Sequence, residues 1–363
     1  MIMLLKCGKK RTKQMGKIGI IGRFGLGHDF YDGQTVKTKN LAWLLEREQR
    51  FSIVKVDTYL FRRKNFKLLI DTLRCMLTCE HVFLLVSVNG MNFYLPFLYY
   101  LNKLTQKKIY HYIIGSELLE MVSKNAKLVK YLNALTVNWF EYESGTRYLQ
   151  EKGVTNVVTL SNFKLITPVA QATSYKSDAA LYRFCTFSRV MEEKGITDAI
   201  LAIKNINEKY GKVIATLDVY GPVEPVYEET LKKLLEENIG YVQYKGTVDS
   251  TQSVSVLKDY YCLLFPTRWP GEGVPGTLID AFAAGIPVIA SDWNANGELL
   301  CNGKQGLMYP NQELQTLNDA VVWAVKNPDE MDRMRLESRQ EFEKYTPETI
   351  LDTILNKMES NSK

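Results

Sequence analysis

Glu272 and Asp280 are separated by seven residues in a glycine-rich stretch, and paired carboxylates suit the hydroxyl groups of a sugar. The stretch RWPGEGVPG (268–276) joins an apolar run to a segment with helical spacing, which ends at Gly285. Glycines allow close approach of the backbone, and the amides of a helix N-terminus attract anions. We therefore predict a phosphate-binding loop with both carboxylates in one pocket, although a glycine-rich turn with solvated carboxylates would have the same sequence.

Two cations follow another strand-like segment. Arg189 and Lys194 lie five residues apart, after YRFCTFS (182–188) and before a helical pattern. This spacing lets both side chains converge on one diphosphate. A surface arginine and lysine are usually only solvated, but a diphosphate needs cations as well as amide donors. We therefore expect the two loops to form one site.

The elements that must position these loops alternate along the chain. Strand-like runs occupy 17–22, 51–57, 81–88, 108–115, 134–138 and 156–161 in the first half, and 182–188, 214–221, 241–246, 261–267, 285–291 and 306–310 in the second. Helical patterns separate them, which predicts βαβ units and an α/β fold of two doubly wound domains with parallel sheets. In such folds ligands bind beyond the carboxyl ends of the strands, where the two loops fall.

Periodicity is lost between residues 163 and 176, which places the domain boundary there. We expect an N-terminal acceptor-binding domain over 1–165, a C-terminal donor-binding domain over 166–345, and a crossover helix with a frayed tail over 346–363. Thr346 is a candidate cap for that helix, with Pro347 at its first position.

The segment GEGVPGTLIDAFAAGIPVIASD (271–292), with FSRVMEEKG (187–195) upstream, resembles the nucleotide-sugar donor site of glycosyltransferase family 4. Weaker matches in family order are DVYGP, YVQYKGTV and NVVTLSNF. The resemblance implies a retaining enzyme with the GT-B fold, in which two Rossmann-like domains face each other across a cleft and the last helix packs back on the first domain.

The resemblance also implies roles for individual residues. Arg189 and Lys194 would neutralise the diphosphate and the leaving nucleotide, Glu272 would contact the transferred sugar, and Asp280 would hold the ribose. Amides around Gly273, Val274, Gly276 and Thr277 would face the β-phosphate, Gly246 and Val248 the base, and Glu298 matches a further recurrent acid. Two departures are that Asp280 stands where Glu is usual and Pro275 where many relatives have Gly.

The N-terminal domain offers fewer signals. Gly33, Gln34 and Thr35 would begin a helix and face the diphosphate across the cleft, as the first loop does in relatives. His111 lies near where relatives place an active-site histidine, but it could equally be a satisfied core residue. The Gly25-x-Gly27 fragment has the wrong spacing for a dinucleotide fingerprint, so NAD binding is rejected.

Charge divides the chain. Residues 1–165 hold 26 Lys and Arg against 12 Asp and Glu, and the remainder holds 20 against 28. The basic half suggests an anionic partner, or only a solvated surface. Its densest clusters are Lys9, Lys10, Arg11 and Lys13, and Arg62, Arg63, Lys64 and Lys67. We expect a cytoplasmic protein that contacts the inner face of the plasma membrane through this half.

Val82–Asn102 carries no charge over a length that could span a bilayer, but Asn89-Gly90 predicts a turn inside it, so strand, turn and buried helix is the better interpretation.

The six cysteines show no Cys-x-x-Cys pair and are taken as reduced core residues. Neither a metal nor a cofactor is expected, since no Asp-x-Asp triplet is present.

If the resemblance holds, a hexosyl group moves from a nucleotide diphosphate sugar, UDP- or GDP-linked, to a hydroxyl of a glycan or lipid-linked glycan in capsule, exopolysaccharide or lipopolysaccharide biosynthesis. Two alternatives remain: a nucleotide-sugar epimerase of the same fold, and a non-enzymatic polyanion-binding protein. No interleaved aromatic and basic motif for nucleic acid is present.

Overall fold

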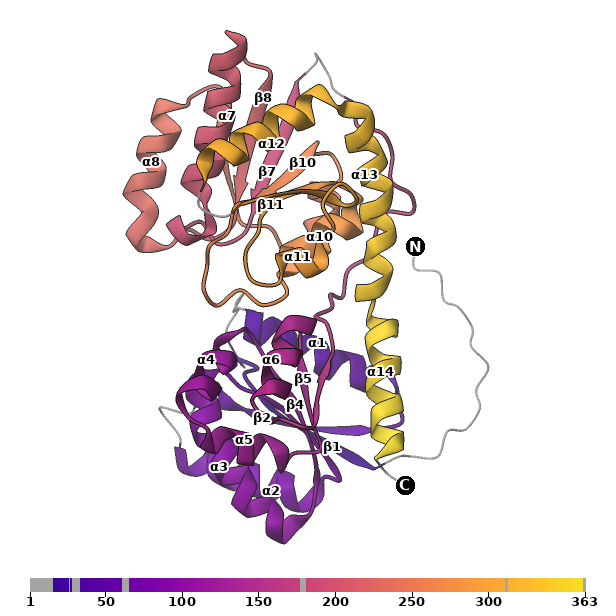
Figure 1. Ribbon diagram of the computed structural model, residues 1–363. Helices are drawn as coiled ribbons and strands as arrows, with labels where there is room; N and C mark the ends of the chain where they lie inside the picture. The colour runs from indigo at the N-terminus through magenta and orange to yellow at the C-terminus, as the bar shows by residue number, and fades with distance from the viewer. Residues whose placement is uncertain are drawn as a thin grey trace.

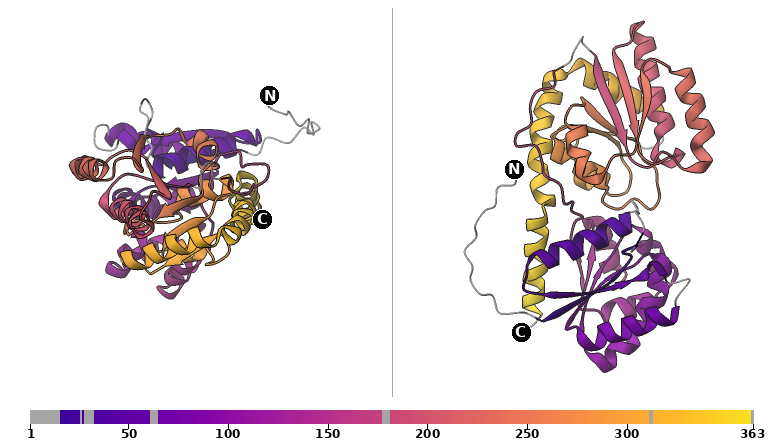
Figure 2. Two further views of the ribbon diagram at one scale, coloured as in Figure 1. Left: turned by 90° about the horizontal axis from the view of Figure 1, so that it is seen from above. Right: turned by 180° about the vertical axis from the view of Figure 1, so that it is seen from behind.

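The computed structural model describes residues 16–25, 27, 33–60, 65–176, 181–310 and 313–361. They form two domains, each with a six-stranded parallel sheet that helices cover on both faces (Figures 1 and 2). The two doubly wound α/β domains that the sequence predicts are therefore confirmed.

The N-terminal sheet has the order β2-β1-β3-β4-β5-β6. Its strands are β1 (Lys17–Gly22), β2 (Ser52–Asp57), β3 (His81–Leu85), β4 (Lys108–Tyr112), β5 (Val137–Phe140) and β6 (Val157–Thr159). The helices are α1 (Gly33–Arg47), α2 (Asn65–Thr78), α3 (Val88–Thr105), α4 (Glu117–Lys124), α5 (Lys127–Asn133) and α6 (Glu143–Glu151). Central strands such as β3 are buried throughout, which explains their continuous apolar sequence.

The C-terminal sheet has the order β12-β11-β10-β7-β8-β9. Its strands are β7 (Tyr182–Phe187), β8 (Ala215–Tyr220), β9 (Val242–Gly246), β10 (Cys262–Phe265), β11 (Val288–Ser291) and β12 (Gly306–Tyr309). The helices are α7 (Ile196–Tyr210), α8 (Glu228–Glu237), α9 (Ser253–Leu257), α10 (Gly276–Ala284), α11 (Asn296–Leu299), α12 (Leu314–Lys326) and α13 (Pro328–Glu341).

Strand order reverses once in each sheet, between β1 and β3 and between β7 and β10. At such a switch point the loops on either side run in opposite directions and leave a crevice. In the C-terminal domain the loops in question follow β7 and β10, and they carry Arg189, Lys194 and Glu272. The topology therefore brings together the two loops that the sequence singles out.

The chain returns to the first domain at its end. After α13, the short helix η6 (Phe342–Tyr345) leads into α14 (Pro347–Ser360), which lies along the N-terminal domain (Figure 1). Ile350, Leu351 and Ile354 of α14 share a core cluster with α1 and with strands of the first sheet. The side chain of Thr346 accepts a hydrogen bond from the amide of Thr349, so the predicted cap is confirmed. The final helix packs back on the N-terminal domain as expected.

One local prediction is wrong. Asn89-Gly90 does not form a turn but lies in the first turn of α3, which continues through Pro96. Proline in a helix removes one backbone hydrogen bond but does not prevent a long helix from forming around it. In the described part of the chain, no helix is both long and apolar enough to cross a bilayer.

Candidate active site

A cavity of about 620 Å³ lies between the domains, and residues of both domains line it. From the C-terminal domain come the loops after β7 and β10 and the start of α10, and from the N-terminal domain the start of α1 and the segment between β3 and α3. The cavity therefore lies at the carboxyl ends of both sheets, beside both switch points. This is where a doubly wound domain binds its ligand.

Lys194 and Glu272 form an ion pair at the C-terminal wall of the cavity. Glu272 also accepts a hydrogen bond of 3.0 Å from the hydroxyl of Thr267. Both charged side chains are buried. A cation and a carboxylate held in this way can address a diphosphate and a sugar hydroxyl side by side.

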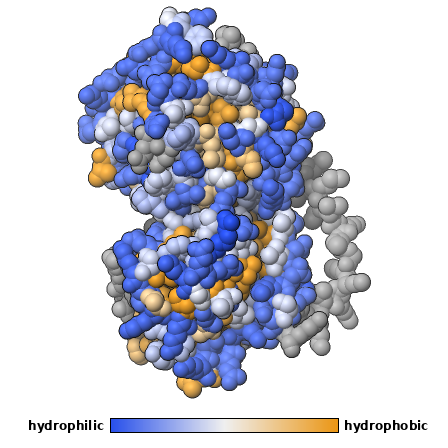
Figure 3. Space-filling model, viewed as in Figure 1, coloured by the Kyte–Doolittle hydropathy of each residue, from blue (hydrophilic) through white to orange (hydrophobic). Residues whose placement is uncertain are grey.

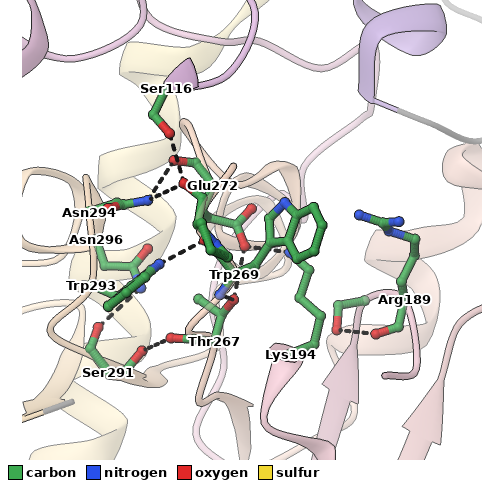
Figure 4. A network of polar contacts seen from close by, with 12 residues as sticks. Ser116, Arg189, Lys194, Thr267, Trp269, Glu272, Ser291, Trp293, Asn294 and Asn296 are labelled. Carbon is green, nitrogen blue, oxygen red and sulfur yellow. Dashed lines mark hydrogen bonds and ion pairs between the residues drawn. The ribbon is translucent and has the colours of Figure 1, made fainter. Parts of the chain in front are cut away.

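Arg189 lies at the more open edge of the site. Its guanidinium carbon is 5.1 Å from the ring centre of Trp269 (Figure 4). Its Nη1 donates to Glu224 at 3.1 Å. The Glu224 carboxylate is partly exposed, so this ion pair is readily exchanged for one with an anionic ligand. Arg189 and Lys194 line the same cavity, as the sequence predicts.

The glycine-rich loop is fixed from behind by the residues after β11. Trp293 Nε1 donates to the carbonyl of Trp269 at 2.7 Å, and Asn294 Nδ2 donates to the carbonyl of Glu272 at 3.1 Å. Asn294 has φ +46°, a left-handed conformation that asparagine tolerates. The segment after β11 therefore holds the backbone on which Glu272 is carried (Figure 4).

Asp280 lies inside α10 and is 1% exposed. Its Oδ2 accepts from Lys164 of the segment after β6, and its Oδ1 accepts from Ser253 at 2.8 Å. Burial raises the pKa of this carboxyl, and Lys164 opposes that shift. The predicted ribose-binding residue therefore already has two partners. Pro275 is the residue immediately before α10.

The N-terminal wall contains residues that sequence reasoning missed: Lys37, Asn40, Glu117, Glu141, Asn162 and Lys164. They come from α1, from α4, from the residue after β5 and from the segment after β6. Apart from Asn162, which falls in the weak match NVVTLSNF, each is a single polar residue with no motif around it. Position after a strand is the one signal that could have singled out Glu141, Asn162 and Lys164.

Most of the predicted site residues lie together. Those that line the cavity are Arg189, Lys194, Val248, Glu272, Gly273, Val274, Gly276, Thr277, Asp280, Gly33 and Gln34. Four do not: Thr35, His111, Gly246 and Glu298. Thr35 is buried within α1, and the carbonyl of Gly246 accepts a hydrogen bond from the amide of Gly221. For Thr35 and Gly246 the prediction found the right segment but not the exposed residue.

His111 is a buried residue of the central strand β4. Its Nδ1 is 3.0 Å from Oδ1 of Asn138, and its Nε2 has no hydrogen-bond partner. Burial lowers the pKa of the imidazole to about 4. Of the two interpretations that the sequence left open, the structure agrees with a core histidine and not with an active-site group.

Glu298, which matches a recurrent acidic position in the sequence, does not line the cavity but contacts the other domain. Its carboxylate accepts from the amides of Glu143 and Ser144 at 2.7 and 2.9 Å. These amides belong to the first turn of α6 in the other domain. Glu298 therefore caps a helix of the N-terminal domain from the C-terminal domain.

Among the residues that the structure describes, no group of three or more His, Cys, Asp or Glu side chains is placed to hold a metal ion. Several basic residues of the expected membrane-facing half lie outside the described residues, namely Lys9, Lys10, Arg11, Lys13, Arg62, Arg63 and Lys64.

Two facing Rossmann-like domains with the site between them define the GT-B class of fold, and comparison with solved structures agrees. HepE of Anabaena, determined with UDP and glucose, superposes with a TM-score of 0.68 at 12% identity, over 95% of this chain and 100% of that one. At this identity the similarity establishes the fold.

Residues 174–348 match the model of the family called glycosyl transferases group 1, and the resemblance seen in the sequence is thereby confirmed. A phosphatidyl-myo-inositol mannosyltransferase of Mycobacterium leprae is 30% identical over 28% of this chain and 26% of its own length. WcaL of Salmonella typhimurium, a putative colanic acid biosynthesis glycosyltransferase, is 27% identical over 40% of this chain and 36% of its own. The alignments thus span about a quarter to a third of these curated relatives.

Proposed function

We propose that the protein is a retaining glycosyltransferase that moves a hexosyl group from a nucleotide diphosphate sugar to a hydroxyl of a glycan acceptor. The observation that carries the proposal is the buried Lys194–Glu272 pair beside Arg189, at the switch point of a domain that matches glycosyl transferases group 1. A cavity of about 620 Å³ is in the usual size range for small-molecule sites.

In this proposal catalysis is electrostatic. Negative charge grows on the diphosphate as the glycosidic bond breaks, and Lys194, Arg189 and the amides at the start of α10 stabilise it without a divalent ion or a further cofactor. Glu272 orients the sugar through its hydroxyls. With no enzyme nucleophile assigned, the acceptor attacks from the face that the diphosphate leaves, and a diphosphate oxygen takes the hydroxyl proton. The anomeric configuration is then retained.

The N-terminal side of the cavity would receive the acceptor. We propose a lipid-linked glycan in cell-surface polysaccharide biosynthesis, in line with the names of the curated relatives. Support comes from helices α2 and α3, which lie next to each other and expose apolar side chains among cations (Figure 3). The exposed residues are Phe66, Ile70, Leu77, Tyr100 and Leu104, together with Lys67 and Arg74. Such a mixture suits the surface of an anionic membrane on the cytoplasmic side.

The proposed activity is tested with a panel of UDP- and GDP-linked sugars, measured by thermal shift and by donor hydrolysis. We expect one donor to raise the melting temperature of the wild type and of Lys204→Ala, a control on the surface of α7, but not that of Lys194→Ala. If no donor stabilises the wild type, the proposal fails. Conversion of the sugar in a donor-only incubation would indicate an epimerase instead.

Membrane contact is tested separately by flotation with vesicles that contain anionic lipid. Phe66→Ser combined with Leu104→Ser should leave the protein unbound, whereas Val226→Ser combined with Ile239→Ser, two exposed apolar residues of the other domain, should not. Wild-type protein that stays in solution at low salt would refute membrane contact. Steep salt dependence with nucleic acid but not with vesicles would favour the polyanion-binding alternative.

A further inference from the structure

Val274 of the glycine-rich loop is held from the other domain on both sides of its peptide backbone. Its amide donates to Oε2 of Glu141 at 3.0 Å, and its carbonyl accepts from Nδ2 of Asn162 at 3.2 Å. A third contact between the domains lies nearby, where the Ser116 hydroxyl donates to the carbonyl of Pro270 at 2.9 Å. The loop therefore receives part of its shape from the N-terminal domain.

Glu141 has its own counter-ion within the N-terminal domain. Lys37 of α1 forms an ion pair with it, and the two side chains are 3% and 5% exposed. The Lys37 amine also lies 4.5 Å from the ring centre of Tyr112. Burial lowers the pKa of Lys37 to about 7, whereas the carboxylate of Glu141 favours the charged amine. Removing one partner of such a pair leaves a buried charge uncompensated.

The glycine at position 273 has a steric reason in this contact. A Cβ added there would collide with Oε2 of Glu141 and would lie 3.4 Å from the Cα of Gly115. Sequence reasoning attributes the glycines of this loop to close approach of a phosphate. The structure gives Gly273 a second requirement, which is close approach of the opposite domain.

We propose that Glu141 is a positioning residue of the donor site, which holds the Val274 amide from the opposite domain so that the loop carrying Glu272 takes its working shape only when the domains are closed. The inference rests on the proposed glycosyl transfer for its catalytic consequence. Val274 is two residues from Glu272, so a displacement of one passes directly to the other. Lys37 acts as the buried partner that keeps Glu141 in place.

This role differs from that of a group that binds the donor. Arg189 and Lys194 lie in the C-terminal domain and do not contact Glu141 among the described interactions, so they can bind a nucleoside diphosphate whether or not Val274 is held. Loss of Glu141 should therefore affect turnover far more than affinity for the nucleoside diphosphate. A misplacement of about 1 Å at the reacting centre can lower the rate by roughly 100-fold.

The test compares Glu141→Ala with Glu120→Gln, in which the altered carboxylate is paired with Lys124 on the exposed face of α4. Amide hydrogen exchange of the unliganded protein is followed over residues 269–276, and UDP and GDP binding and donor turnover are measured in parallel. We expect Glu141→Ala to raise exchange in this loop about 10-fold and to lower kcat by roughly 10- to 100-fold. Nucleoside diphosphate affinity should change less than about threefold, and the control should match the wild type.

Unchanged loop exchange, or equal losses of kcat and of nucleoside diphosphate affinity, would overturn the inference. The exchange measurement needs no substrate, so it decides the contact even if the wild type proves to have no transferase activity. A second variant guards against simple misfolding: Glu141→Gln combined with Lys37→Met keeps an oxygen for the Val274 amide and removes both buried charges. It should recover most of the protection of the loop, and failure to do so in a folded protein would contradict the proposed contact.

Discussion

The two walls of the cavity are built in different ways. On the C-terminal side, most of the residues that could bind a donor lie in two short segments, 187–195 and 271–280, and each segment follows one strand. On the N-terminal side, Lys37, Glu141 and Lys164 come from three separate elements. The first wall comes from two segments that are each contiguous in the sequence, and the second exists only once the sheet has formed. The difference suggests that the donor side is set locally, whereas the N-terminal side is set by the tertiary fold.

The largest effect should come from the C-terminal wall. Glu272→Ala removes the carboxylate that pairs with Lys194 and leaves that buried amine without a counter-charge. If Glu272 and Lys194 act together on the donor, kcat/KM should fall by about 10²- to 10³-fold, which is the usual loss for one preorganised charged or polar group. Transfer assays with the identified donor measure it, with Glu236→Ala on α8 as a surface control. A loss under about fivefold would mean that this wall is not the catalytic one.

The second prediction concerns His111, the residue of the N-terminal domain that the sequence put forward. Its pKa is lowered to about 4 by burial, from an ordinary value near 6.5. The unfolded chain therefore binds the proton first as pH falls, and stability should be lost between about pH 6.5 and 4. The loss should reach about 3 kcal/mol, since each pKa unit corresponds to about 1.4 kcal/mol.

In His111→Gln, which can still bond to Asn138, this pH dependence should disappear while kcat at pH 7.5 stays within about threefold of the wild type. Chemical denaturation at several pH values, followed by circular dichroism, provides the measurement. A large loss of kcat with normal stability would return His111 to the active site and would blur the contrast between the walls.

The fold could be predicted from the sequence because its signals are local. Eleven of the twelve strands that the structure describes lie within a strand-like run, and β5 overlaps one, since buried parallel strands are apolar throughout. The exception, Asn89-Gly90, shows that a turn dipeptide yields to a helix when the following residues pack against the sheet. The donor wall was found for the same reason, because loop and helix are adjacent in sequence.

The N-terminal wall could not be predicted, because nothing near Lys37 or Glu141 in the sequence identifies the partner. Their meeting depends on the strand order of the first sheet, and the contact of Glu141 with Val274 depends on how the domains face each other. Glu298 illustrates the same limit. Its sequence position suggests a ligand contact, and only the fold places it against α6.

A third prediction joins the two walls at Asp280. This carboxylate stands where the resemblance leads us to expect Glu, and its oxygens accept hydrogen bonds from Lys164 and Ser253. Asp280→Glu adds a methylene to a site that is 1% exposed, which should lower the free energy of unfolding by about 1–3 kcal/mol through overpacking. Denaturation measures it, and Asp352→Glu, at an exposed site on α14, is the control. Unchanged stability would mean that the site accommodates Glu at position 280 and that the contact with Lys164 does not require the shorter Asp side chain.

The smallest effect is expected where the C-terminal domain acts on the N-terminal one. Glu298 accepts from two amides at the start of α6, so it links the domains through the end of a helix. Glu298→Gln keeps one oxygen for these amides but removes the charge that favours a helix N-terminus, and such terms are small at an exposed position. We expect donor KM to rise no more than about threefold, with kcat nearly unchanged and Glu229→Gln on α8 equal to the wild type. A loss of kcat as large as that expected for Glu141→Ala would mean that closure depends on contacts spread over the whole interface, and Val274 would no longer be the point at which the N-terminal wall sets the shape of the donor loop.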